Sequence, residues 1–277
     1  MDLSNNIKYT EFTNIKNINL QDRIITEPNF LPISPSDMNL LDLVAVYNDG
    51  RNWKVIPIDI LTRYVVFYDK HFDKIKNKKG ENIVSDISIT FCPYTFAAVI
   101  YFKKYAPTNK LYRGNIVLKD LEDGLLVPQI IGNKFVRKKE IKLMTLRNVI
   151  SNFPDCSYFN NNIDKLPRIV SDEYITNKDV DVLVDNINSK YHPKTLVYGI
   201  EYKSIDTTIN DYKYSVIIGA DASNSINKDS LFDYVKNGYN DYFNLAIDKI
   251  RDKGGVIIPC FWFCWMGIHE NSKIVKL

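Results

Sequence analysis

The sequence is poor in the side chains that carry most enzyme chemistry. Its 277 residues include three histidines, four cysteines and three tryptophans. It contains no G-x-G-x-x-G, P-loop, H-E-x-x-H or G-x-S-x-G pattern. The usual signatures of dinucleotide binding, nucleotide hydrolysis, zinc proteolysis and serine hydrolysis are therefore absent, and we expect no cofactor.

Long apolar runs are also missing. The first twenty residues are polar and lack the apolar centre of a signal peptide. No run in the chain is long enough to span a bilayer. We therefore expect an intracellular protein, cytoplasmic or part of a virion if the source is a virus. Secretion, disulfides and a membrane partner are not expected.

Neither sign of charge is in excess. The 36 Lys and Arg residues are interspersed with 33 Asp and Glu residues, and the net charge is +3. This balance argues against dedicated nucleic-acid binding. Asn, Ile, Lys and Tyr are abundant, which is typical of proteins from AT-rich genomes such as those of some protists and large DNA viruses. That bias concerns the source and not the chemistry.

The longest apolar run covers residues 88–102 and is rich in β-branched and aromatic side chains. Pro93 interrupts it, and a proline cannot donate to a strand ladder. The pattern predicts a strand that ends near Cys92, a turn over residues 93–96, and a second strand over residues 97–101.

Other segments give further local predictions. Residues 43–47 and 53–58 form a predicted hairpin, because the Asn-Asp-Gly between them favours a turn. Residues 111–118 are predicted to be one strand with Gly114 as a bulge. Residues 143–153 have helical spacing, whereas residues 59–73 fit either a helix or a strand.

The predicted fold class is α+β, rich in mostly antiparallel strands, with two weakly duplicated sub-lobes. One apolar stripe predicts a long helix over residues 230–253. The expected organisation has four parts: an extended N-terminal arm (1–40), a first β-rich lobe with the Cys-Pro motif (41–160), a linker (161–195), and a second lobe with the long helix and a Trp-rich C-terminal strand (196–277).

Four segments, in order, resemble the long form of the family called domain of unknown function 3179. Its opening strand-turn-strand is similar to residues 42–61, and its hallmark V-T-Y-C-P-L-C-G-T-A is similar to ITFCPYTFAA at residues 89–98. Its Pro-Lys-x-x-V-x-G-V-E segment is similar to PKTLVYGIE at residues 193–201. Its closing F-W-F-A-W segment is similar to residues 261–269.

The departures from this family concern its polar residues. By register, the family's His falls on Tyr64 and the following Glu on Val65. The second Cys and the Gly of the hallmark fall on Thr95 and Phe96. If the family has a Cys/His site, this chain keeps only Cys92. The imidazole, carboxylate and second thiol that a metal or redox centre needs are replaced.

The remaining candidate residues have plain structural interpretations. Cys92 is a candidate nucleophile or metal ligand, but an apolar neighbourhood favours a buried, inert thiol. Cys260 and Cys264 share a face, yet a zinc site needs two more ligands, so no metal is expected. His71 and His192 are expected to be solvated. The sequence does not settle the setting of His269.

These observations favour a non-catalytic structural or partner-binding protein, such as a virion or host-interaction component of a large DNA virus. The expected partner is another protein or a second copy of the chain. The alternative is a cysteine-dependent or metal-binding enzyme centred on Cys92, and the sequence leaves both open with a preference for the first.

Overall fold

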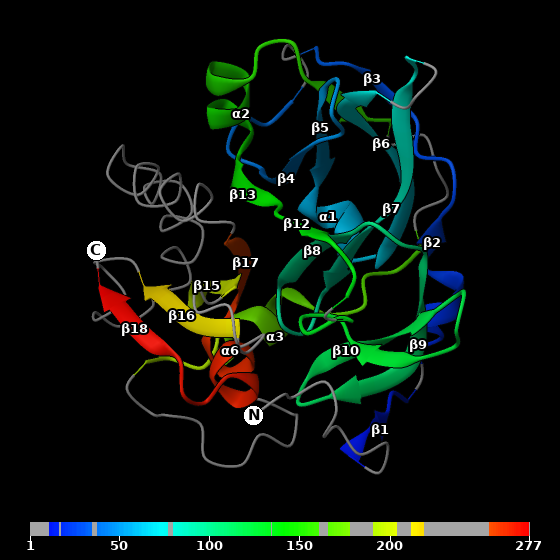
Figure 1. Ribbon diagram of the computed structural model, residues 1–277. Coiled ribbons are helices and arrows are strands. Elements are labelled where there is room, and N and C mark those ends of the chain that lie inside the picture. The colour runs from blue at the N-terminus through cyan, green and yellow to red at the C-terminus, as the bar shows by residue number, and fades with distance from the viewer. Residues whose placement is uncertain are drawn as a thin grey trace.

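The computed structural model describes residues 11–16, 18–34, 38–76, 80–133, 135–160, 166–177, 191–203, 212–218 and 255–276. Within these residues the strands form four sheets, and the helices are few and short (Figure 1). Most strand pairs are antiparallel, so the expected β-rich α+β class is confirmed. The long helix expected over residues 230–253 lies outside the described residues.

The central sheet contains the Cys-Pro hairpin. β7 ends at Cys92, residues 93–96 form a turn, and β8 begins at Ala97, as predicted. Cys92 pairs with Ala97 across the turn. The strands of this sheet, in spatial order, are β12 (Lys138–Lys139), β8 (Ala97–Tyr101), β7 (Asn82–Cys92), β6 (Val66–Lys76) and β2 (Ile24–Ile25).

A second sheet contains the predicted hairpin at Asn48-Asp49-Gly50, which is confirmed. Gly50 has φ +97°, and a Cβ there would lie 1.9 Å from the carbonyl oxygen of Phe72. Only glycine therefore allows this turn to lie against β6. The strands, in spatial order, are β13 (Lys142–Thr145), β4 (Leu43–Asn48), β5 (Trp53–Pro57), β14 (Ser157–Phe159) and β3 (Phe30–Pro32).

A third sheet corrects the prediction of one bulged strand over residues 111–118. The chain reverses at Arg113 and Gly114, whose φ angles are +45° and +82°. Two successive left-handed residues make a tight hairpin loop and not a bulge. The strands, in spatial order, are β1 (Thr13–Asn14), β9 (Tyr105–Tyr112), β10 (Asn115–Asp120) and β11 (Leu126–Pro128).

The short helices refine two predictions. The helix expected over residues 143–153 begins only at Leu146, because residues 142–145 pair with β4 as β13. The open question at residues 59–73 is answered by a short helix followed by β6. The helices of this part are η3 (Leu20–Asp22), α1 (Ile58–Leu61), α2 (Leu146–Asn152) and α3 (Asp172–Thr176).

The fourth sheet belongs to the C-terminal half, and beside it the expected Trp-rich strand is instead a helix, α6 (Trp262–Ile268). The backbone N–H groups of Trp262 and Phe263 donate to the carbonyls of Thr195 and Pro193, which turns the chain out of the strand. Every residue of α6 is buried, so apolar side chains occupy all of its positions. The sequence therefore shows no alternation of apolar and polar residues that could distinguish a helix from a strand. The strands, in spatial order, are β17 (Val256–Phe261), β15 (Leu196–Lys203), β16 (Tyr212–Ile218) and β18 (Lys273–Lys276).

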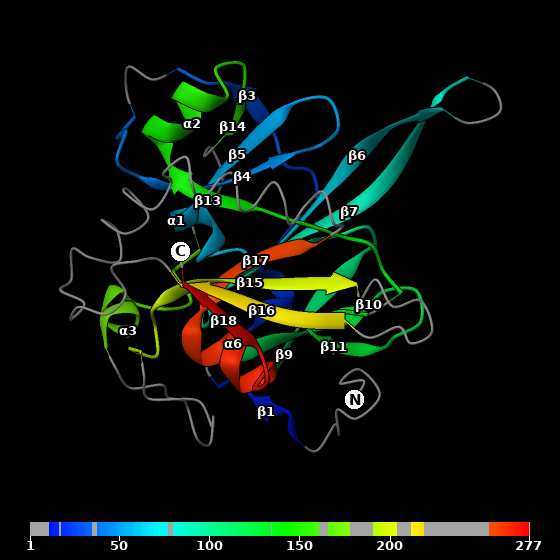
Figure 2. The ribbon, with the colours of Figure 1, turned by 60° about the vertical axis from the view of Figure 1, so that its left-hand side comes forward.

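One hydrophobic core includes side chains from both halves of the chain. The ring of Phe96 stacks on Phe261 with centroids 5.1 Å apart, and the Phe261 N–H donates to the Thr95 carbonyl at 2.7 Å. The C-terminal sheet therefore docks on the Cys-Pro turn. Away from that contact, β6 and β7 extend together beyond the rest of the described chain as a two-stranded ribbon (Figure 2).

A glycine on β15 tests this packing. A Cβ at Gly199 would lie 2.0 Å from Cε3 of Trp265. We expect Gly199→Ala to lower the free energy of unfolding by about 3 kcal/mol, at the upper end of overpacking costs. Adding Trp265→Phe should recover part of that loss, because the smaller ring leaves room for the methyl group.

Urea denaturation of both variants measures the effect. Gly80→Ala measures the cost of backbone strain alone, because Gly80 has φ +81° and no atom lies within 4 Å of a Cβ built there. Equal costs at Gly199 and Gly80 would contradict the close contact with Trp265.

Candidate functional site

Cys92 is fully buried at the end of β7. Its Sγ accepts a hydrogen bond from the Ile116 N–H at 3.4 Å and lies 3.7 Å from the Gly114 carbonyl, to which the thiol donates. Burial raises the pKa of the Cys92 thiol above its ordinary value. The group is therefore neutral at physiological pH, and its reactivity as a nucleophile is low.

The sequence resemblance singled out four further positions. Tyr64, Val65, Thr95 and Phe96 are all buried. The Phe91 N–H donates to the Val65 carbonyl at 2.9 Å, which brings the segment before β6 beside the end of β7. The segment with Tyr64 and Val65 therefore lies beside the end of β7, and Phe96 stacks on Phe261. Thr95 accepts a hydrogen bond from Asn115 through its hydroxyl.

A buried polar layer lies next to Cys92. Gln129 donates through Nε2 to Thr90 Oγ1 at 3.0 Å and to the Ala97 carbonyl at 3.1 Å. Asn115 donates through Nδ2 to Gln129 Oε1 at 3.0 Å and to Thr95 Oγ1 at 3.1 Å. These side chains hold the β7–β8 hairpin on β10.

Sequence reasoning missed this layer. Asn115 and Gln129 are polar side chains of types usually found on the surface. Their only signal is position, since apolar residues follow each of them directly in the chain. Both amides bond to neighbouring protein groups, so the layer has a structural role.

The other cysteines are also buried. Burial raises the pKa values of Cys260 and Cys264, and the nearby Cys92 thiol adds to the effect. The structure therefore gathers three of the four cysteines, whereas Cys156 packs in a separate cluster under α2. Among the residues that the structure describes, no group of three or more His, Cys, Asp or Glu could hold a metal ion.

His269, which the sequence left unsettled, is buried directly after α6. Its ring packs on Trp265, and its Nε2 lies 4.0 Å from Oε1 of Glu201. Oε2 of Glu201 lies 2.5 Å from the ammonium of Lys138 on β12. Burial, together with the nearby Lys138, lowers the pKa of His269 to about 3, and burial raises the pKa of Glu201.

The other two histidines also have structural settings. The expectation that His71 is solvated is wrong: it is buried, its ring meets the edge of Phe102, and its Nε2 lies 3.7 Å from Asp73. Charged neighbours in the sequence suggested exposure, but β6 alternates its side chains and turns His71 inward. His192 is half-buried and accepts the Lys194 N–H through Nδ1 at 3.1 Å.

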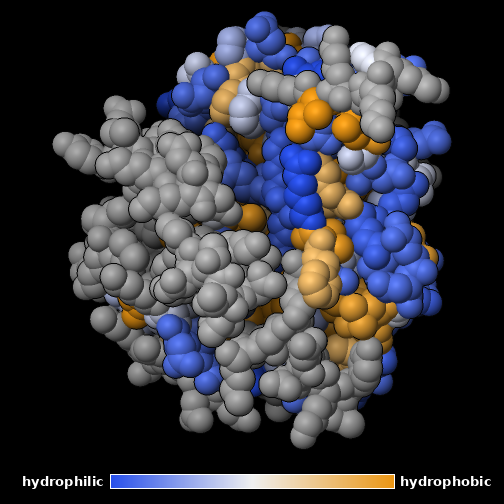
Figure 3. All heavy atoms as spheres, in the orientation of Figure 1, coloured by the Kyte–Doolittle hydropathy of each residue, from blue (hydrophilic) through white to orange (hydrophobic). Residues whose placement is uncertain are grey.

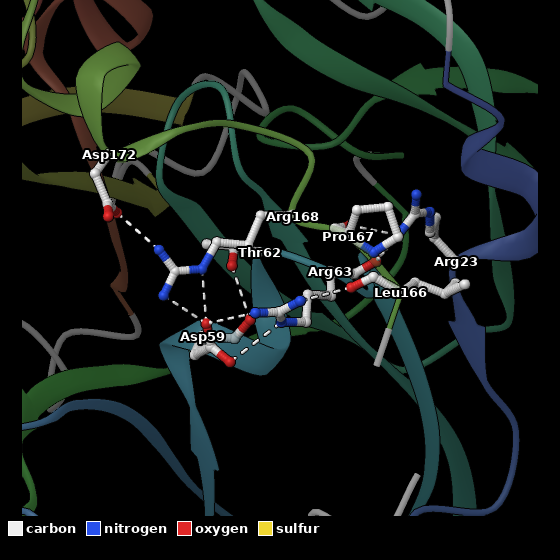
Figure 4. A network of polar contacts seen from close by, with 8 residues as sticks. All are labelled: Arg23, Asp59, Thr62, Arg63, Leu166, Pro167, Arg168 and Asp172. Atoms are coloured by element: carbon white, nitrogen blue, oxygen red, sulfur yellow. Dashed lines mark hydrogen bonds and ion pairs between the residues drawn. The ribbon is translucent and has the colours of Figure 1, made fainter. Parts of the chain in front are cut away.

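A cluster of arginines joins the expected linker to α1 (Figure 4). Arg63 and Arg168 both donate to the carboxylate of Asp59, at 3.1 Å and 2.7 Å. Arg63 also donates to the Leu166 carbonyl, and Arg23 to that of Pro167. Partial burial alone would raise the pKa of Asp59, but the guanidinium groups of Arg63 and Arg168 outweigh it and hold this pKa below its ordinary value. The cluster is a clamp for residues 166–168.

No helix in the described part of the chain is both long and apolar enough to cross a membrane. Comparison of the chain with models of protein families, with curated proteins and with solved structures gave no match.

The burial of Cys92 gives the first prediction for this site. Cys92→Ala removes a small buried group, so we expect a loss of about 1 to 2 kcal/mol in the free energy of unfolding. In the native protein, Cys92 should react with a thiol reagent only as fast as the protein opens. Mass spectrometry of the labelled peptide measures this rate, and rapid labelling without denaturant would refute the buried, neutral thiol.

His269 gives a pH-dependent prediction. Its folded-state pKa of about 3 lies below the ordinary 6.5, so below pH 6.5 the unfolded chain binds a proton that the native state does not. Stability should therefore fall as the pH drops from 6.5 towards 3. Between pH 6.5 and 5 the loss from this group is about 1.5 kcal/mol.

The raised pKa of Glu201 acts in the opposite direction, because the native state then takes up a proton more readily than the unfolded chain. Urea denaturation across this pH range compares His269→Gln with the control His192→Gln. Only His269→Gln should flatten the profile, and equal profiles for the two variants would argue against the assignment.

Proposed function

We propose that this chain is a non-catalytic structural or partner-binding protein. We further propose that it uses the scaffold of the domain of unknown function 3179 family without that family's polar site. One observation carries the proposal: Tyr64, Val65, Thr95 and Phe96, which stand by register at the polar positions of the family, are all buried, and none of them supplies an imidazole, a carboxylate or a thiol.

The chemistry of Cys92 supports the same view. A nucleophilic cysteine needs a thiolate, which a nearby base or cation stabilises. The groups that bond to Cys92 Sγ are backbone groups of Ile116 and Gly114 and the side chain of Thr95, and none of these is a base or a cation. Burial raises the pKa of the thiol. Of the histidines, His269 packs on Trp265 and His71 on Phe102.

Three of the segments that resemble the family contact one another in the structure, and this supports the resemblance. The Thr95 carbonyl, in the Cys-Pro segment, accepts the Phe261 N–H at 2.7 Å. The Thr195 carbonyl accepts the Trp262 N–H at 2.8 Å, and Gly199 packs directly on Trp265. The segments that resemble the family in sequence are therefore hydrogen-bonded and packed against one another.

The partner that we propose is a protein, either a different chain or a second copy. Surface charges such as Lys70–Asp86 and Arg137–Asp73 form pairs of opposite sign, which supports a solvated surface and not a dedicated nucleic-acid interface. A cytoplasmic or virion location and a viral source fit this role. The weak duplication and the long C-terminal helix stay predictions.

Native mass spectrometry and metal analysis of protein from its source test the proposal. We expect a complex larger than the monomer, no stoichiometric zinc, copper or iron, and the same complex in Cys92→Ser. Cys156→Ser is the matched control, because Cys156 is buried away from this site.

Two results would count against the proposal. One is stoichiometric metal that Cys92→Ser releases and Cys156→Ser retains. The other is a strictly monomeric protein whose catalytic turnover is lost only in Cys92→Ser.

A further inference from the structure

Exposed apolar side chains alone do not identify the partner that covers a surface. On the face shown in Figure 3, apolar side chains lie among hydrophilic ones, and such a pattern fits many partners. The surface beside α1 is more informative, because a segment of the chain itself lies on it. We call this segment, residues 166–171, the strap. It belongs to no helix and to none of the four sheets.

The backbone of the strap is held by groups of the first lobe and not by strand pairing. The guanidinium groups of Arg63 and Arg23 donate to two successive strap carbonyls, at 2.7 and 2.8 Å (Figure 4). The Ile169 N–H donates to the Thr62 carbonyl at 2.9 Å. Pro167 has no N–H to satisfy and a fixed φ, so this part of the strap is extended before it docks.

The side chains of the strap fix its register. Nε and Nη2 of Arg168 lie 2.7 and 2.6 Å from Oδ1 of Asp59. A guanidinium presents these two donors in one rigid plane, whereas a lysine offers a single point charge. Directly after the arginine, Ile169 and Val170 are buried in the main hydrophobic core. The register therefore depends on an arginine that is followed by two apolar residues.

The groups that hold the strap form a site at the surface. We call them the strap site: Arg23, Asp59, Thr62 and Arg63. The side chains of Arg168 and Asp59 are 39% and 34% exposed, so solvent reaches their ion pair. The strap offers this site two carbonyls, one N–H, one guanidinium and two apolar side chains. A separate extended chain with the same residue pattern offers the same groups.

We propose that the strap site is a docking site for an extended segment of a different protein, and that the strap is its internal, autoinhibitory occupant. The docking segment contains an arginine followed by two apolar residues. Its arginine takes the place of Arg168 on Asp59, and its carbonyls accept from Arg23 and Arg63. This inference rests on the proposed function and deepens it, because it names the surface and the chemistry of the partner.

A different protein is favoured over a second copy of this chain. A tethered segment competes with an effective concentration on the order of millimolar. The strap of a second copy would make only the contacts that the chain's own strap already makes, so an exchange would gain no free energy. A different protein displaces the strap when it adds contacts beside the docking segment.

Fluorescence anisotropy with a labelled peptide tests the site. The peptide has the sequence of the strap, Leu-Pro-Arg-Ile-Val-Ser, and the protein is the full chain. The strap variant is Arg168→Ser with Ile169→Ala, which weakens the tethered competitor. We expect the peptide to bind this variant at least about tenfold more tightly than it binds the wild-type chain.

A milder variant covers the case in which the double variant does not fold. Arg168→Ser alone changes an exposed side chain and keeps Ile169 and Val170 in the core. It should bind the peptide at least about threefold more tightly than the wild-type chain, because the tethered competitor has lost its ion pair. Circular dichroism establishes that each variant is folded.

Further changes test whether the peptide occupies the strap site. Asp59→Asn, added to either variant, should weaken peptide binding at least about tenfold, because the arginine of the peptide loses its counter-ion. Asp86→Asn changes another surface carboxylate, on β7, and should leave peptide binding unchanged. A peptide that carries Arg168→Glu should not bind.

Three outcomes would overturn the proposal: a peptide that binds neither variant, equal affinity for the wild-type chain and both variants, or binding that Asp59→Asn does not weaken. A native complex that contains only copies of this chain would end this inference and leave the proposed function standing. Peptide binding of the expected kind by a protein that is otherwise monomeric, with turnover lost in Cys92→Ser, would do the reverse.

Discussion

A turn that is buried in a core must find partners for its backbone groups within the protein, because water cannot reach them. The turn after Cys92 meets this requirement with groups from distant parts of the chain. The Thr95 carbonyl accepts the Phe261 N–H, and the Thr95 hydroxyl accepts from Asn115. Phe96, with φ +54°, stacks on Phe261. The turn between β7 and β8 therefore has all of these partners only when the C-terminal segment is in place.

The same docking explains the charged groups inside the interface. Lys138 on β12 and Glu201 on β15 pair at 2.5 Å, and His269 lies beside them. A buried ion pair adds little net stability, because removing both charges from water costs about as much as their attraction returns. Its effect here is orientation: a sheet that docked in another register would leave a charge buried without its counter-ion.

Sequence reasoning succeeded where local chemistry decides the backbone. The turns at Gly50 and Pro93 follow from residues that allow or demand a particular φ angle, and both were predicted. The prediction failed where contacts with residues distant in the sequence determine the backbone conformation. Arg113 adopts a left-handed φ that its type does not suggest, and α6 is apolar on every side. At the candidate site, Cys92 was found from its motif, but Gln129 was missed because only folding brings it there.

The interior also limits where function can lie. The positions around Cys92 are occupied by side chains that pack, and the polar layer of Asn115 and Gln129 is bonded to neighbouring protein groups. Gly199 is a position where no side chain fits, because Trp265 lies against its backbone. In such an interior, the residue types are determined by the space that the neighbouring side chains leave. Ile75 and Leu121 are exposed, so packing in the interior does not explain why these positions are apolar. Apolar groups that remain in water would gain free energy if another surface covered them. The requirements of the interior therefore account for the residues around Cys92 but not for these exposed apolar side chains.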